Sequence, residues 1–100
     1  MGTYIVLTKM AGAAMRSEQD SVKDAIKDGA PESRKLIEKH GGKLLEACLT
    51  LGAYDGAAIV EFPSDLKCAQ AMLAWREFGV TTETLPAWPE KAWGKMAAVI

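Results

Sequence analysis

The sequence contains few of the residues that usually mark a chemical function. Among 100 residues there are two cysteines and one histidine, too few for the usual ligand sets of a transition-metal site. Two cysteines make no disulfide framework, which fits a reducing cytoplasm. No P-loop, dinucleotide-binding fingerprint or Gly-x-Ser-x-Gly nucleophile motif occurs. We therefore expect no metal and no cofactor, and we expect Cys48 and Cys68 to be small core residues.

The chain also lacks an excess of either charge and any long apolar run. Twelve Lys and Arg residues against thirteen Asp and Glu residues give a net charge of −1, so there is no basic excess to hold a phosphate backbone. The apolar runs are too short to span a bilayer, and no signal-peptide pattern precedes the first strand. We predict a single domain over residues 1–100, located in the cytoplasm, that binds neither nucleic acid nor membrane.

What the sequence does contain is an alternation of strand-like and helix-like segments. Apolar, β-branched segments bounded by Gly and Pro predict strands at 3–8, 43–51, 54–62 and 80–85. Helical spacing predicts helices over 22–40 and 66–78, and a last helix that begins at Pro89. The order β-α-β-β-α-β plus a C-terminal helix is typical of ferredoxin-like α+β folds. We expect a four-stranded antiparallel sheet with the first and third strands central, both main helices on one face and the last strand at an edge.

Local signals predict where these elements begin and end. Asp20 or Ser21 is the expected cap of the first helix, and a loop or weak helical turn is expected over 11–14. Pro31 predicts a kink or the start of a second helix, and Gly41-Gly42 ends the helix. Ser64 or Asp65 caps the second main helix, which Gly79 ends.

The hairpin, the last strand and the last helix carry further signals. Gly52-Ala53 predicts a two-residue type II′ turn, with Asp55-Gly56 as the rival turn. Pro86 is expected to close the last strand, as suits an edge. The last helix is expected to pack on the domain through one apolar stripe, formed by Ala92, Trp93, Met96, Ala97 and Ile100.

Both faces of the predicted sheet are apolar, although helices can cover only one. The third strand contains the continuous run 57–60, and the first contains Ile5-Val6-Leu7, where a solvated face would alternate with polar residues. An uncovered apolar face promotes aggregation. We therefore expect a homodimer, closed by two-fold symmetry, or a higher homo-oligomer. The alternative is that small alanines and the last helix cover this face.

The hairpin resembles a known family signature. Leu51-Gly52-Ala53-Tyr54-Asp55, followed by Ala58-Ile59-Val60-Glu61, is similar to the Gly-x-Tyr-Asp motif of the GYD domain family. The resemblance extends to Tyr4–Lys9, Asp20-Ser21, Gly41-Gly42-Lys43 and Thr82–Leu85. Two departures are Val22, where proline is common, and about five additional residues near Asp28–Pro31, where surface insertions are tolerated. The resemblance implies a dimeric α+β barrel and no assigned reaction.

Tyr54 and Asp55 are the candidate ligand-binding residues. Adjacent strand residues point to opposite faces, so one of them can reach a pocket; the structural alternative is a packed ring and a turn acceptor. Lys9, Glu61 and Glu83 either line a cavity or face water. His40 is a general base or, more simply, an end of the first helix. Trp75, Trp88 and Trp93, with Met72 and Met96, form either an apolar cavity or core and dimer contacts.

Two classes of function fit these features. The first is a dimeric small-molecule-binding or interaction module, whose ligand is a small apolar molecule. The second is a cofactor-independent or haem-handling enzyme of the dimeric α+β barrel type, resembling monooxygenases and isomerases; fold-level analogy carries little weight for activity. The sequence favours the module, identifies no catalytic residue and leaves an enzymatic role open.

Overall fold

The computed structural model describes residues 2–10 and 22–100, with only the backbone described at 22–26, 28 and 30. The predicted loop over 11–14 and the predicted caps Asp20 and Ser21 lie outside the described residues. Within the described residues the fold is α+β, with one four-stranded antiparallel sheet.

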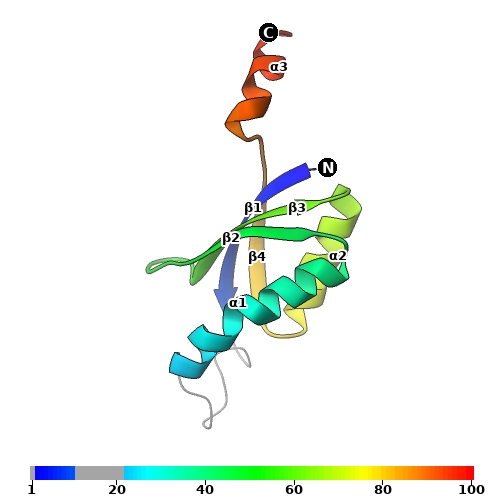
Figure 1. Ribbon diagram of the computed structural model, residues 1–100. Helices are drawn as coiled ribbons and strands as arrows, with labels where there is room; N and C mark the ends of the chain where they lie inside the picture. Colours follow the sequence, from blue (N-terminus) through cyan, green and yellow to red (C-terminus); the bar gives the residue numbers. More distant parts are fainter. Residues whose placement is uncertain (1, 11–21) are drawn as a thin grey trace.

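The sheet is built from strands β1, β2, β3 and β4, which span Gly2–Met10, Lys43–Leu49, Gly56–Phe62 and Val80–Ala87. Their order across the sheet is β2-β3-β1-β4, and every neighbouring pair is antiparallel (Figure 1). This confirms the predicted ferredoxin-like topology, with β1 and β3 central and β4 at an edge. It follows that the two central strands contribute most of each face of the sheet.

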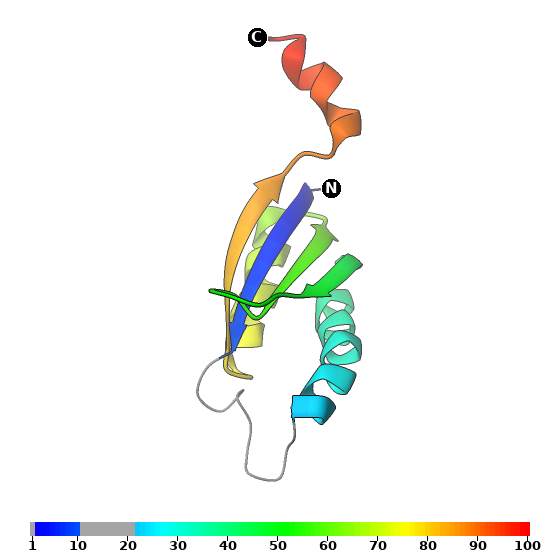
Figure 2. The same cartoon turned by 90° about the vertical axis from the view of Figure 1, so that its left-hand side faces the viewer.

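Two helices cover one face of this sheet. Helix α1 spans Val22–Lys39 and helix α2 spans Asp65–Arg76. Figures 1 and 2 show both helices on the same side, so the other face is left open. A short 3₁₀ helix, η2 (Glu90–Ala92), and helix α3 (Trp93–Ala97) follow β4.

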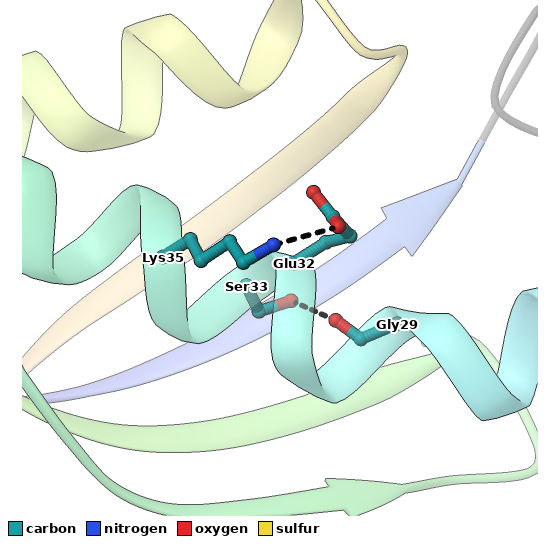
Figure 3. A network of polar contacts seen from close by, with 4 residues as sticks. All are labelled: Gly29, Glu32, Ser33 and Lys35. Carbon is teal, nitrogen blue, oxygen red and sulfur yellow. Dashed lines mark hydrogen bonds and ion pairs between the residues drawn. The ribbon is translucent and has the colours of Figure 1, made fainter.

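Helix α1 is continuous through its proline, so a second helix does not begin at Pro31. Proline removes one helical hydrogen bond. Close to Pro31 in the same helix, the Ser33 hydroxyl donates a hydrogen bond to the Gly29 carbonyl at 2.8 Å (Figure 3). The predicted end at Gly41 is confirmed. Gly41 has φ +83, and the amides of Gly41 and Gly42 donate to the carbonyls of Glu38 and Ile37, the bonds of a Schellman motif.

The cap of helix α2 is also the predicted one. Ser64 is extended, and its hydroxyl accepts a hydrogen bond from the Lys67 amide at 3.2 Å, which satisfies one of the free donors at the helix start. Gly79, with φ +78, follows the helix and leads directly into β4.

The β2–β3 hairpin differs from the prediction. The strands end at Leu49 and Gly56, which pair with each other, so six residues connect them where a two-residue turn was expected. The loop is held by contacts outside itself, because the Asp55 amide donates to the Thr8 carbonyl at 2.8 Å. Gly52 does adopt the predicted positive φ, at +140.

Strand β4 continues past Pro86 to Ala87, two residues further than predicted. Pro86 pairs in register with Tyr4 of β1. An edge strand tolerates proline because its outer side needs no hydrogen-bond partner.

The core lies between the sheet and the helices. Val6, Ile37, Val60 and Phe62 are completely shielded from solvent. The rest of the buried cluster comes from the same face and from the inner side of α2: Tyr4, Leu44, Ala58, Cys68, Ala71, Met72, Trp75 and Val80. Alternation along β1 and β3 sends the intervening side chains to the open face.

Candidate functional site

A small pocket lies on the open face of the sheet, beside the β2–β3 hairpin. Its volume is about 270 Å³. It is lined by Leu7, Lys9, Ala53, Tyr54, Thr81, Thr82 and Glu83. We call it the open-face pocket. It brings together an amine, a phenol, two hydroxyls and a carboxylate from β1, the hairpin and β4.

Tyr54 lines this pocket from the hairpin loop, whose backbone is held by a hydrogen bond within the loop. The Thr50 hydroxyl donates to the Tyr54 carbonyl at 2.6 Å, which fixes the backbone at that point. The Tyr54 side chain is half-buried. Of the residues expected either to line a cavity or to face water, Lys9 and Glu83 line the open-face pocket with Tyr54.

Asp55 does not line this pocket. Its carboxylate accepts a hydrogen bond from the Met10 amide at 2.8 Å, and its amide donates to the Thr8 carbonyl at 2.8 Å. The Thr50 amide donates to the Asp55 carbonyl at 3.1 Å. Asp55 therefore ties the hairpin to the end of β1, so the structure separates the two candidate residues into a pocket side chain and a structural one.

Sequence reasoning missed a second polar pair, Tyr4 and Asp65. Tyr4 is only 5% exposed, and its hydroxyl donates to the carboxylate of Asp65 at the start of α2. This hydrogen bond, together with burial and the carboxylate charge, raises the pKa of Tyr4 to about 12. The phenol therefore stays protonated, and can donate to Asp65, up to a higher pH than a free tyrosine would. The two residues are 61 positions apart, and no local pattern connects them.

Tyr4 and Asp65 line a larger pocket of about 570 Å³ at the end of the sheet. Glu61 and Lys91 line it too, with Trp88 and Pro89 from the segment that follows β4. Part of its wall is therefore the segment that leaves the domain, and its shape depends on where that segment lies.

A third hollow of about 480 Å³ lies between α1 and α2. Leu36, Trp75 and Phe78 contribute apolar side chains to this hollow, and His40 also lines it. An exposed ion pair, Lys35 with Glu32 at 3.6 Å, lies on α1 beside it (Figure 3). His40 is thus part of the helix layer, and it does not line the open-face pocket.

A comparison with protein-family models matches residues 4–97 to the GYD domain. The chain belongs to the GYD domain family. No curated protein and no solved structure matches it significantly. The signature of this GYD domain lies in the hairpin that forms one wall of the open-face pocket: Gly52 supplies a positive φ, Tyr54 a pocket side chain and Asp55 the tie to β1.

The two cysteines of the GYD domain differ in environment. Cys68 is buried, as predicted, and burial followed by the charge of Asp65 raises the pKa of its thiol, which makes it a poor nucleophile. Cys48 is exposed, so its predicted place in the core is wrong. The bulge between Leu44 and Glu46 shifts the register of β2, which brings Cys48 opposite Ala57 of the open face.

The tryptophans do not share one cavity. Trp75 and Met72 are buried in the core, whereas Trp88 and Trp93 are each 57% exposed beyond the end of the sheet. In the described residues, no group of three or more His, Cys, Asp or Glu side chains is placed to hold a metal ion. No helix in the described parts of the chain has the length and apolar character needed to cross a membrane.

Proposed function

We propose that this GYD domain works as a homodimer whose two open sheet faces enclose a small-molecule site beside Tyr54. The observation that carries the proposal is an apolar row across the middle of the open face. Leu85, Ile5 and Ile59 are direct cross-strand partners on β4, β1 and β3. They are 48%, 37% and 39% exposed.

The surroundings of this row support a covered interface. Charged side chains lie toward the margins of the same face: Lys9, Lys43, Glu46, Glu61 and Glu83. An apolar centre with a polar rim is the usual anatomy of a protein–protein interface. A second copy is the partner that presents the same self-complementary face under two-fold symmetry.

The ligand part of the proposal rests on the open-face pocket. Its 270 Å³ falls just below the roughly 300 Å³ at which small-molecule sites begin. A facing copy would add the missing wall and exclude water. The lining is mostly polar, so it suits a small molecule with several polar groups, held by the Tyr54 hydroxyl, Lys9 or Glu83, more than the small apolar molecule expected from the sequence.

Native mass spectrometry of freshly purified protein tests both parts together. We expect a dimer that carries a co-purified small molecule. Tyr54→Phe should lose that molecule and keep its melting temperature, whereas the control Tyr4→Phe should keep the molecule. Ligand retained equally by Tyr54→Phe would refute the assigned site, and a wild-type monomer would refute the assembly.

The same pocket also supports a second candidate, a cofactor-independent enzyme. Phenol, amine and carboxylate groups are the usual participants in general acid–base catalysis, and Tyr54, Lys9 and Glu83 line one pocket. Incubating the protein with the molecule that it retains distinguishes the two candidates. A binding module returns the molecule unchanged, whereas an enzyme converts it.

A further inference from the structure

The segment after β4, residues 88–100, forms an arm that leaves the domain. Figures 1 and 2 agree that it continues beyond the end of the sheet in the direction of β4. The molecule measures 54 × 26 × 19 Å, and its radius of gyration is 14.8 Å, against about 13 Å for a compact chain of this length. Within the described residues, α3 packs substantially only on η2. The expectation that the last helix packs on its own domain is therefore wrong.

The C-terminal arm is rich in exposed apolar side chains, which is typical of a segment that packs against another surface. Trp88 and Trp93 are each 57% exposed and Met96 is 41% exposed, while Val99 and Ile100 are almost fully exposed. Helix α3 has five residues, far fewer than the roughly 12 at which an isolated helix becomes even marginally stable in water. Within the arm, Trp93 Nε1 donates a hydrogen bond to the Trp88 carbonyl at 2.9 Å, which ties the start of α3 to the residue that follows β4. An apolar arm of this kind needs an apolar surface to be stable.

The position of the arm indicates which surface it meets. It is the direct continuation of β4, whose Leu85 belongs to the apolar row of the open face. A second copy placed against the open face therefore lies beside the start of the arm.

We infer that each C-terminal arm packs on the second copy of the chain, so that the dimer exchanges its two arms. This inference rests on the proposed dimer and extends it. Under two-fold symmetry each chain gives one arm and receives one, so both apolar arms are covered by a single closed arrangement. The partner's arm then adds apolar side chains to an interface whose centre is the row Leu85, Ile5 and Ile59.

Isotope-filtered NMR on mixed dimers tests this inference with the full chain. Dimers are formed from one methyl-labelled copy and one unlabelled copy, and Met96→Leu assigns the Met96 methyl signal. We expect nuclear Overhauser contacts between the labelled Met96 methyl and protons of the unlabelled copy. A dimer in which Met96 contacts only its own chain, or contacts nothing, would overturn the inference and leave the proposed dimer intact.

Sedimentation of three variants separates the arm from the open face. Met96→Glu should raise the dimer dissociation constant at least tenfold, whereas the control Lys95→Gln, which changes the net charge equally, should leave it nearly unchanged. If Met96→Glu dimerises like the wild type, the exchanged arm is refuted. If Ile59→Lys remains dimeric while Met96→Glu does not, the arm is supported and the open-face interface is refuted. A monomeric wild type refutes both.

Discussion

On the helix-covered face of the sheet, Val6 and Val60 are completely shielded from solvent, whereas Ile5 and Ile59, the preceding residues on the same strands, are 37% and 39% exposed. The two faces thus carry side chains of similar size and chemistry. They differ in what covers them: α1 and α2 cover one face, and nothing from the described chain covers the other. Burial of apolar area is the main source of folding free energy, so the first face can stabilise the monomer and the second can stabilise an assembly. The following predictions test this division.

The largest effect is expected from truncating the covered face. Phe62→Ala should lower the free energy of unfolding by about 3–5 kcal/mol, since it removes a fully buried ring and leaves a cavity. Ile59→Ala, three residues earlier on the same strand, should cost clearly less under the same conditions. Urea denaturation of both variants measures the difference. Equal losses would show that the open face stabilises the fold as much as the covered face does.

On the open face, an added charge should weaken dimerisation and leave the fold of the monomer unchanged. Ile59→Lys should weaken dimerisation by about 2 kcal/mol or more, roughly 30-fold in the dissociation constant, because an unpaired charge would be buried in the centre of the interface. Its far-ultraviolet circular dichroism should remain that of the wild type, since Ile59 makes no part of the core. Concentration-dependent sedimentation measures the first effect. An unchanged dissociation constant would remove this face from the interface.

The hairpin beside the open face should be sensitive to backbone strain. Gly52→Ala should lower stability by about 1 kcal/mol or more, because φ there is +140 and an alanine at positive φ is strained. A Cβ at Gly52 or at Gly29 would meet no atom within 4 Å, so neither substitution is hindered by contacts. Gly29→Ala, inside helix α1, should therefore stabilise by about 0.5–1 kcal/mol. Changes of the same sign in thermal unfolding would contradict this explanation.

Tyr4, on the helix-covered face, gives a pH-dependent test of this division. The pKa of Tyr4 is raised from 10 to about 12 in the folded state, so its stabilising contribution is fully present below pH 10 and is lost as the pH rises toward 12. Tyr4→Phe should cost about 1 kcal/mol at pH 8 and should show a smaller fall in stability between pH 10 and 12 than the wild type. Identical pH profiles for Tyr4→Phe and the wild type would disprove the coupling with Asp65.

The smallest effect is expected at Asp55. Asp55→Asn keeps an oxygen that can accept from the Met10 amide, so stability should change by less than about 1 kcal/mol and ligand retention should persist. Asp55→Ala loses that acceptor and should be the less stable of the two in thermal unfolding. If Asp55→Asn loses the ligand while its stability is unchanged, Asp55 is a ligand-binding residue and the structural role given to it here is wrong.

Much of the fold could be predicted because its signals are local. Ser64 caps α2 and Gly41 ends α1 through bonds within five residues, and such bonds are visible in sequence. The hairpin was mispredicted because its shape depends on Asp55 bonding to the backbone of Thr8 and Met10, more than forty positions away. The pair Tyr4 and Asp65 was missed for the same reason. The apolar stripe of the last helix led to the wrong prediction that this helix packs on its own domain, because a stripe does not specify which surface it meets.

Sedimentation equilibrium of the unmodified chain at micromolar concentration tests the central claim most directly. The account predicts one species of twice the 10.8 kDa chain mass, held by an interface that buries at least about 1,200 Å². A single species of 10.8 kDa across that concentration range would contradict it.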